Sequence, residues 1–538
     1  MYRSIEKTSG RINPLLMTLL IGGVAVIGLV FLLPSGGVKQ SSEREPLRML
    51  VAAGLRVPVE EVLEEFQEEL DTQVIVQYGG SNMLLGQLKV NKFEQPDLYL
   101  AADEFYIQNA YAEGLTEEVF PIASQEPVLA MRKDRAADFA TWQQLLELGL
   151  RWSIPDPEQA ANGRAVQEIL SQISWQSGSL WDQVHQQTLD RGVFKPTVNE
   201  TNNDIKIGAV DIGFVWSSTV AAPENRDELV AVRLKSLAET AELADFAEQI
   251  TLAVLTTSSQ PTAALRLARY MTAADRGLPK FSAVGMSVIA GDSWAETPEL
   301  TFYCGAVNRR AVEPVIDRFQ RREGVIVNTV FDGCGILTGR MGAIAGQAQA
   351  AGFPDVYMAC DRYYLENVQD WFQEDVNVSQ TEIVLVVPKG TTQVKELPDL
   401  LKPGVRVSVG EPDQCTIGAL TRRLLQQAGL YDQFKEKQGR ADEVIVEKSS
   451  SALIVPDVLT GAVDVAVAYR NDVLQHQDDV DVISIPSPLT KAIQPLSIAK
   501  GSEFKNLSRR LYRQIEKAQE SFESAGFEFL LPAAGPKR

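Results

Sequence analysis

The chain has 538 residues, of which 45% are hydrophobic and 23% are charged. At roughly 150 residues per domain, this length predicts three or four compact units, and the composition excludes a disordered, collagen-like or polytopic membrane protein. The 71 acidic residues outnumber the 51 basic ones, and the net charge of −20 disfavours nucleic acid and anionic membrane surfaces as partners. The two histidines, His185 and His476, lie far apart, which disfavours histidine-based zinc sites and Ser-His or Cys-His catalysis.

An uncharged run at residues 15–33 is the first feature along the chain. At 1.5 Å per residue, it approaches the roughly 30 Å hydrocarbon thickness of a bilayer. Three basic residues and one acidic residue precede it, so the positive-inside rule places residues 1–14 in the cytoplasm. We therefore expect a single-pass transmembrane anchor at 15–33 in the cell membrane, a flexible tether at 34–46 and a periplasmic, extracytoplasmic remainder. A cleaved signal peptide is the alternative.

The rest of the chain contains an internal repeat. The matching segments occur in the same order in both copies: 56–66 with 309–319, 96–103 with 354–361, 156–163 with 411–418, and 208–216 with 461–469. This collinear order indicates one tandem duplication. We name the copies module 1, expected at residues 47–290, and module 2, expected at residues 298–530.

Within each module, short strands rich in β-branched residues alternate with amphipathic helices. This alternation favours an α/β fold with a mainly parallel sheet and helices on both faces. Two lobes around a hinged cleft are expected, because a second group of strands begins in each module and the chain then returns to the first. In module 1 we expect strands at 47–53, 73–78 and 98–102 and helices at 57–70, 83–90 and 104–113. The second lobes begin with strands at 127–132 and 383–388, and the returning strands lie at 250–255 and 492–499.

The repeated segments resemble the periplasmic molybdate- and tungstate-binding proteins of ABC importers, which have the type II periplasmic-binding-protein fold. The resemblance rests on segment 156–163 and its repeat partner, on the Pro-Asp-x-Tyr-x-Ala-x-Asp strand ends, and on Gly-x-x-Asp before Trp216 or Tyr469. It implies that each module closes around a small oxyanion, molybdate or tungstate, and delivers it to an ABC transporter permease. It implies no catalytic residue and no cofactor.

The resemblance also implies ligand positions in both modules. In module 1 they are Gly54, Ser81, Asn162, Val198 and Trp216, and in module 2 they are Val307, Cys334, Ile417, Ser451 and Tyr469. An ionised oxyanion is held well by neutral donors such as hydroxyls and the N–H groups of helix N-termini.

Several of these positions depart from the family pattern. Gly54 and Val307 lack the serine that is usual in the family, Trp216 replaces a tyrosine, and Cys334 offers a weaker donor than a hydroxyl. Phosphate, sulfate or iron therefore stay open as alternative ligands. The same glycine- and serine-rich turns are also typical of ordinary loops between a strand and a helix.

All four cysteines lie in module 2, and none of them has the C-x-x-C spacing of a zinc or redox motif. In an open α/β sheet, Cys304, Cys334, Cys360 and Cys415 would converge on the cleft edge. Disulfides, free thiols and a soft-metal site are three alternatives, and a thiol redox protein is the corresponding alternative function.

Asp103 and Asp361, with the nearby tyrosines Tyr106, Tyr363 and Tyr364, suggest a ferric-ion site as a further alternative. We expect instead that the two aspartates cap the helices that follow them, because aspartate is a preferred residue at helix N-termini. A ligand sensor that reports to a partner protein is another alternative function.

Overall fold

The computed structural model describes residues 45–90, 95–237, 246–345 and 352–532. The predicted cytoplasmic segment, the anchor at 15–33 and nearly all of the tether lie outside these residues. Within them, no helix is long and apolar enough to cross a membrane. A spanning helix needs about 20 apolar residues, whereas the longest helices described, Arg56–Leu70 (α2) and Arg309–Glu323 (α12), have 15 residues and an exposed charged face. The described residues therefore do not support the prediction of a single-pass protein of the cell membrane.

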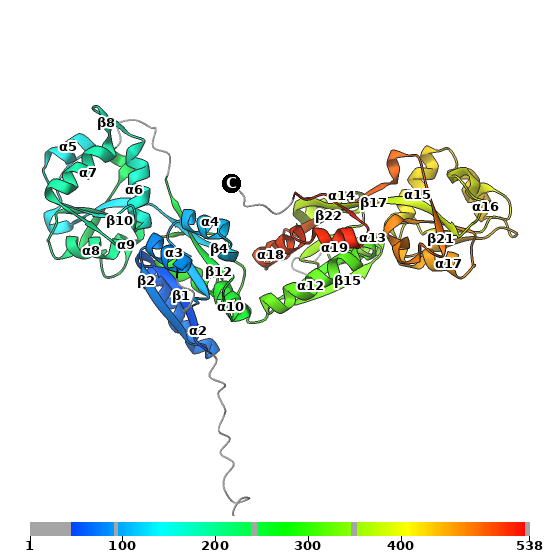
Figure 1. Ribbon diagram of the computed structural model, residues 1–538, viewed down its shortest axis with the longest axis horizontal. Coiled ribbons are helices and arrows are strands. Elements are labelled where there is room, and N and C mark those ends of the chain that lie inside the picture. Colours follow the sequence, from blue (N-terminus) through cyan, green and yellow to red (C-terminus); the bar gives the residue numbers. More distant parts are fainter. Residues whose placement is uncertain (1–44, 91–94, 238–245, 346–351, 533–538) are drawn as a thin grey trace, which may run out of the picture. The chain divides into compact units, whose positions relative to one another are not determined.

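The first lobe of module 1 is a six-stranded sheet with helices packed beside it (Figure 1). Its strand order is β13-β4-β12-β3-β1-β2, with β1 and its neighbours β2 and β3 parallel, and β12 antiparallel to β3 and β4. The strands are Leu47–Ala52 (β1), Val74–Gly79 (β2), Leu98–Ala101 (β3), Thr116–Gln125 (β4), Glu248–Leu255 (β12) and Ser287–Val288 (β13). The helices are α2, Ser81–Val90 (α3), Glu104–Ala112 (α4), Pro261–Met271 (α10), Gly277–Ala283 (α11) and the 3-10 turn Ala53–Leu55 (η1).

The second lobe of module 1 is a five-stranded sheet in the order β11-β5-β10-β6-β9. Trp152 and Phe214 fill its core, with ring centroids 5.7 Å apart. Its strands are Pro127–Arg132 (β5), Trp152–Pro155 (β6), Val193–Lys195 (β9), Ile212–Trp216 (β10) and Leu229–Arg233 (β11). Its helices are Trp142–Glu147 (α5), Ala161–Ser171 (α6), Leu180–Arg191 (α7), Val198–Lys206 (α8) and Ser217–Ala221 (α9).

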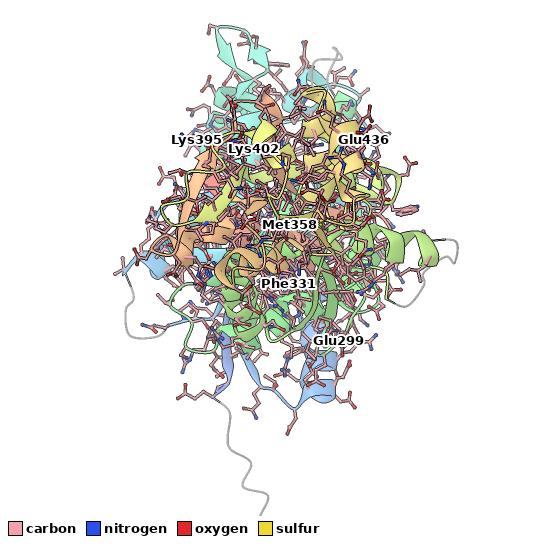
Figure 2. The ribbon with its side chains drawn as sticks, turned by 90° about the vertical axis from the view of Figure 1, so that its right-hand side faces the viewer. Glu299, Phe331, Met358, Lys395, Lys402 and Glu436 are labelled. Atoms are coloured by element: carbon pink, nitrogen blue, oxygen red, sulfur yellow. The ribbon has the colours of Figure 1, made fainter. Side chains whose placement is uncertain are left out.

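Module 2 repeats this order of elements. Its strands lie in the order β15-β14-β16-β22-β17-β20-β18-β19, and β21 and β23 pair with β17. The strands are Glu299–Gly305 (β14), Ile326–Asp332 (β15), Val356–Met358 (β16), Phe372–Pro388 (β17), Val407–Gly410 (β18), Ile445–Lys448 (β19), Val465–Tyr469 (β20), Val480–Ser484 (β21), Lys491–Ala499 (β22) and Glu528–Phe529 (β23). In Figure 2, Glu299, Phe331 and Met358 belong to its first lobe, and Lys395, Lys402 and Glu436 belong to its second.

Two short 3-10 turns of module 2 carry predicted ligand positions: Ala306–Asn308 (η4) contains Val307, and Ser451–Leu453 (η7) begins with Ser451. The α-helices are α12, Cys334–Ile344 (α13), Arg362–Glu366 (α14), Thr416–Gln427 (α15), Tyr431–Gln438 (α16), Val455–Leu459 (α17), Lys505–Glu516 (α18) and Gln519–Ser524 (α19). The series β1-η1-α2-β2-α3-β3-α4 in module 1 and β14-η4-α12-β15-α13-β16-α14 in module 2 match element by element. The tandem repeat of two α/β modules is therefore confirmed.

Two details of the predicted sheets differ in the structure. The sheets are mixed rather than mainly parallel, because the strands that carry the chain from one lobe to the other and back pair antiparallel. The strand expected to begin at 383 is the second half of β17, whose first half pairs with β22 and whose end pairs with β20 and β21. In module 1, Glu126 separates the corresponding strands β4 and β5.

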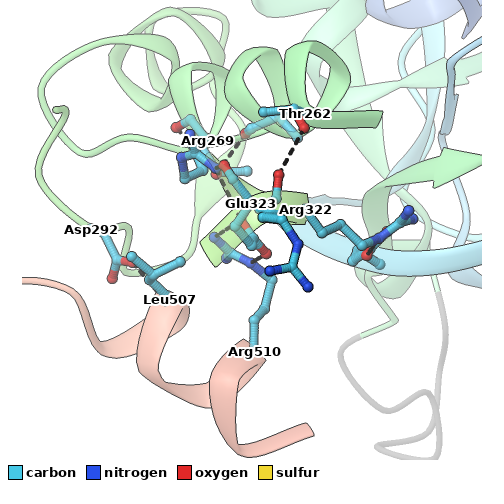
Figure 3. Close-up of polar contacts among 11 residues, drawn as sticks. Thr262, Arg269, Asp292, Arg322, Glu323, Leu507 and Arg510 are labelled. Carbon is cyan, nitrogen blue, oxygen red and sulfur yellow. Dashed lines mark hydrogen bonds and ion pairs between the residues drawn. The ribbon is translucent and has the colours of Figure 1, made fainter. Parts of the chain in front are cut away.

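A buried ion-pair cluster joins α10 of module 1 to α12 and α18 of module 2 (Figure 3). Glu323, which is 2% exposed, accepts hydrogen bonds from Arg269 Nη1 at 2.9 Å and from Arg510 Nε at 2.7 Å. Both arginines offset the desolvation of this carboxylate, so its pKa is lowered although burial alone would raise it. Nearby, the Asp292 carboxylate accepts the Leu507 N–H at 2.9 Å, near the first turn of α18.

Candidate functional site

All five predicted ligand positions of module 1 line one small cavity between its lobes. The cavity volume is about 20 Å³, which is enough for a water molecule, so a larger anion enters only if the lobes separate and close again. The remaining lining residues are Ala52, Ala53, Gly79, Gly80, Ala102, Ala160, Ala161 and Thr197, and every side chain that lines the cavity is uncharged.

Three helices begin at this cavity. Ser81 is the first residue of α3, Ala161 that of α6 and Val198 that of α8, and all three line the cavity wall. The first turn of a helix has N–H groups without partners inside the helix, and the helix dipole places partial positive charge there. Because three such termini meet, the cavity favours an anion without needing a basic side chain.

The buried side chain of Asn162 lies in the first turn of α6. It is 1% exposed, and neither its Oδ1 nor its Nδ2 atom has a hydrogen-bond partner among the described residues. A buried amide without partners is costly, since desolvation of each polar atom is not repaid. The amide is therefore available to a ligand in the cavity.

Ser81 lines the cavity on the side of the first lobe, and Tyr99 behind it bonds to its backbone. Ser81 is 1% exposed, its carbonyl oxygen accepts the Tyr99 hydroxyl at 2.7 Å, and its Oγ accepts only a long contact of 3.4 Å from the Ala102 N–H. The hydroxyl hydrogen of Ser81 thus remains free to turn toward the cavity.

Gly54 and Trp216 depart from the family pattern together, and their packing accounts for it. A Cβ atom at position 54 would lie 2.8 Å from Val198 Cγ1 and 3.2 Å from Trp216 Cδ1. Val198 and the Trp216 indole together therefore occupy the space that a serine side chain at position 54 would need.

Residues that the sequence did not single out hold the two lobes of module 1 together. Asn199 Nδ2 donates to the Ala53 carbonyl oxygen at 2.7 Å, and Asn82 Nδ2 donates to the Glu158 carbonyl oxygen. A Cβ atom at Gly80 would lie 2.3 Å from the Gln159 carbonyl oxygen, so the lobes touch where this residue has no side chain.

The cleft also continues outward into a larger cavity of about 430 Å³, which shares Ala53, Gly54 and Thr197 with the inner one. Arg56 and Lys206 lie among the residues that line it. With Glu224 also in its wall, the outer cavity thus carries charged side chains of both signs, which the inner cavity lacks.

The equivalent positions in module 2 are buried but chemically different. Val307, Cys334, Ile417, Ser451 and Tyr469 are each at most 6% exposed. The serine and asparagine of module 1 become cysteine and isoleucine, so module 2 keeps fewer hydrogen-bond donors at these positions.

Asp472 is a module 2 residue that sequence reasoning missed. Burial raises the pKa of its carboxyl to about 7, although Arg310 and a hydrogen bond with Ser451 act in the opposite direction. The repeat spacing of 253 residues, as between Arg56 and Arg309, aligns Asp472 with Thr219 of module 1. The acidic residue in place of threonine is the sequence signal that could have identified it. A carboxylate at this point would repel an oxyanion.

The alternative metal sites receive little support from the described residues. Asp103 and Asp361 accept the backbone N–H groups of Phe105 and Tyr363 at 2.8 and 3.0 Å, so the prediction that they cap α4 and α14 is confirmed. The part of the chain that the structure describes contains no group of three or more His, Cys, Asp or Glu residues that could hold a metal ion.

The three tyrosines considered as ferric-ion ligands pack against other residues in the structure. Tyr106 is 2% exposed, and the rings of Tyr363 and Tyr364 meet edge to face with centroids 5.0 Å apart. Burial raises the pKa values of Tyr106 and Tyr364, which disfavours the phenolate form that binds ferric ion.

Comparison with known proteins identifies the family. The family model described as bacterial extracellular solute-binding protein matches residues 47–280 and again residues 300–528. The chain belongs to this family. Its members are binding proteins, which agrees with the prediction of a solute-binding module and places the chain among extracytoplasmic proteins.

Individual relatives of this solute-binding protein cover about one module each. A binding protein of Haemophilus influenzae is 28% identical over 228 residues, which are 42% of this chain and 85% of the relative. An ABC transporter substrate-binding lipoprotein of Bacillus subtilis is 27% identical over 198 residues, 35% of this chain and 73% of the relative. The solved periplasmic molybdate-binding protein of Azotobacter vinelandii is 16% identical, with a TM-score of 0.38, covering 45% of this chain and 100% of its own.

Proposed function

We propose that this chain is the extracytoplasmic solute-binding component of an ABC importer and that module 1 binds a small oxyanion, molybdate or tungstate. The observation that carries the proposal is the meeting of three helix N-termini and the unpartnered Asn162 amide in one cavity with uncharged walls. Such a cavity stabilises a small anion by dipoles and hydrogen bonds alone.

Closure of the lobes supplies the second part of this function. In the proposed cycle, the anion enters module 1 when the lobes are apart, and its contacts to both lobes then favour the closed form. The permease distinguishes the loaded protein by the population of that closed form. The Bacillus subtilis relative, an ABC transporter substrate-binding lipoprotein, supports the assignment to an importer.

The choice of molybdate or tungstate rests on the resemblance of the repeated segments to the periplasmic molybdate- and tungstate-binding proteins. Sulfate and phosphate have the same tetrahedral shape and are the competing ligands within this proposal. Phosphate carries a proton near neutral pH, so it would need an acceptor in the cavity, and the Asn162 Oδ1 atom is the free acceptor there.

A thermal-shift panel tests the proposal. Molybdate and tungstate are expected to raise the melting temperature of the full chain more than sulfate or phosphate at equal concentration, because a ligand that binds only the folded state stabilises it. Asn162→Asp places a negative charge in the cavity and is expected to abolish the shift. Asn367→Asp, at an exposed position of module 2, is the matched control and is expected to keep it. Equal shifts with Asn162→Asp and wild type would reject the assigned site.

A further inference from the structure

The four cysteines of module 2 are buried free thiols that converge on the inner edge of its sheets. Cys304 lies near the end of β14, Cys334 begins α13, Cys360 follows β16, and Cys415 precedes α15. All four thus lie at one edge, as predicted, but their contacts differ. Two of them form a close pair, and the other two face backbone carbonyls.

Cys334 and Cys360 form the pair. Their Sγ atoms lie 3.0 Å apart, and the Cys360 N–H donates to Cys334 Sγ at 3.1 Å. Position 305 has to be glycine beside them, because a Cβ atom there would lie 2.2 Å from Cys360 Sγ and 2.9 Å from Cys334 Sγ. The backbone of β14 therefore allows the two sulfurs to touch.

The other two thiols point elsewhere. Cys304 Sγ lies 3.8 Å from the Gly305 carbonyl oxygen, and Cys415 Sγ lies 3.3 Å from the Lys448 carbonyl oxygen. Burial raises the pKa of the Cys415 thiol to about 12 and that of Cys304 well above its usual value, so both remain protonated.

The surroundings of Cys334 favour its thiolate. Burial opposes ionisation, but hydrogen bonding within the Cys334–Cys360 pair, including the bond from the Cys360 N–H, outweighs it, and the pKa of Cys334 is lowered. The hydrogen bond to Cys334 and burial raise the pKa of Cys360, which stays protonated as the donor. The first turn of α13 adds its dipole to the stabilisation of a thiolate at Cys334.

The second lobe covers this pair. Cβ atoms at Gly333 and Gly335 would lie 2.5 Å from the Gln414 carbonyl oxygen and 2.3 Å from the Asp413 carbonyl oxygen. The loop before α15 therefore packs directly against the start of α13. As a result, Cys334 is 0% exposed and Cys360 is 5% exposed. A reagent reaches the sulfurs only when the lobes of module 2 separate.

We propose that Cys334 and Cys360 are a dithiol site that forms a reversible disulfide by exchange with an external disulfide compound. The Cys334 thiolate attacks one sulfur of the external disulfide, whose S–S bond breaks and releases one thiolate, and this thiolate takes a proton from water in place of the one that Cys334 lost on ionising. The Cys360 thiol then gives up its proton and attacks the Cys334 sulfur of the mixed disulfide, and the second thiolate leaves and takes up that proton. Two electrons pass to the external disulfide, which ends as two thiols.

This site replaces the oxyanion donors at the same place in the repeat. By the collinear alignment, Cys334 corresponds to Ser81 and Cys360 to Ala102 of module 1. Module 2 thus carries a sulfur where module 1 carries a hydroxyl donor, and the Cys360 N–H donates to that sulfur. The two modules have diverged in chemistry while keeping one fold.

Thiol counting on the reduced full chain, before and after incubation with oxidised glutathione, tests the proposal. The number of free thiols in the unfolded protein is expected to fall from four to two, and peptide mass spectrometry is expected to find residues 334 and 360 linked with the loss of two hydrogens. Dithiothreitol is expected to restore four thiols. Four thiols after prolonged incubation, or a link between any other pair, would overturn the proposal.

Variants separate the two steps. Cys360→Ser is expected to stop at the mixed disulfide, with one glutathione attached to residue 334, whereas Cys334→Ser is expected to take up none. The double variant Cys304→Ser/Cys415→Ser is the matched control and is expected to lose its two remaining thiols at a rate within about twofold of wild type. Attachment of glutathione in Cys334→Ser would refute the role of this thiolate, and the wild-type mass measurement stands even if a variant does not fold.

Discussion

The side chain of Asn199 in the second lobe of module 1 donates from Nδ2 to the Ala53 carbonyl oxygen in the first lobe, at 2.7 Å. Ala53 also lines both the inner and the outer cavity. One hydrogen bond therefore joins the two lobes at the entrance of the proposed anion site, and separation of the lobes would break it.

Asn199→Ala is expected to weaken anion binding about fivefold, because a lost hydrogen bond of about 1 kcal/mol disfavours the closed form. The melting temperature without ligand is expected to change little, since Asn199 is only half-buried. Isothermal titration of molybdate measures the effect. The control is Asn367→Ala, at an exposed position of module 2, and an equal loss in both variants would contradict the role of the lobe-to-lobe bond.

Gly80→Ala tests closure through sterics. A Cβ atom at this position would lie 2.3 Å from the Gln159 carbonyl oxygen and 3.0 Å from the Pro196 carbonyl oxygen, both in the opposite lobe. The variant is expected to fold but not to close, with an affinity loss on the order of 100-fold. Gly86→Ala, in the helix α3 that follows Gly80, is a matched control, since a Cβ atom there would meet nothing within 4 Å. Small-angle scattering that finds the same ligand-induced compaction in Gly80→Ala would reject this account.

Glu323→Gln tests the buried cluster between α10, α12 and α18. Without the carboxylate, Arg269 and Arg510 remain buried with reduced compensation, and breaking a buried ion pair costs roughly 3 kcal/mol or more. Urea denaturation is expected to show a clearly lower midpoint. Glu313→Gln, which removes a half-exposed pair with Arg309, is expected to change the stability by less than about 0.5 kcal/mol. Equal midpoints for the two variants would mean that the cluster contributes little.

Asp472 makes a prediction about pH. Its pKa rises from 3.8 to about 7 on folding because the carboxyl is buried. The folded state therefore binds this proton more tightly than the unfolded state, and the resulting stability is present at low pH and is lost as pH rises through about 7. Between pH 5 and pH 8, the melting temperature of Asp472→Asn is expected to fall less than that of wild type. The exposed Asp317→Asn variant should follow wild type, and parallel curves for all three proteins would contradict the shift.

The sequence predicted the order of elements well and the side-chain contacts only in part. The strands and helices before residue 113 end within about two residues of the predicted bounds, because each has a local hydrophobic period and a glycine or a polar residue at its end. The antiparallel partners of β12 and β17 were missed, because pairing between strands far apart in the chain leaves no local pattern. Ser81, Asn162 and Trp216 were located through the family resemblance, not through composition.

The cysteines illustrate the same limit. The strand ends placed all four at one edge of the sheet, but the sequence left three alternatives for their state. Which two sulfurs meet depends on the approach of Gly305, and this approach follows from the packing of β14 against β16. Asn199 and Asp472 were missed for a similar reason, since their roles arise from contacts between lobes and from burial.

The most direct test of the central claim is an isothermal titration of the full chain with molybdate, with sulfate under the same conditions for comparison. The account predicts one molybdate per chain, a weaker response to sulfate, loss of the heat in Asn162→Asp and retention of it in the module 2 variant Ser451→Ala. Two molybdate ions per chain, or heat that survives Asn162→Asp, would contradict an oxyanion site confined to module 1.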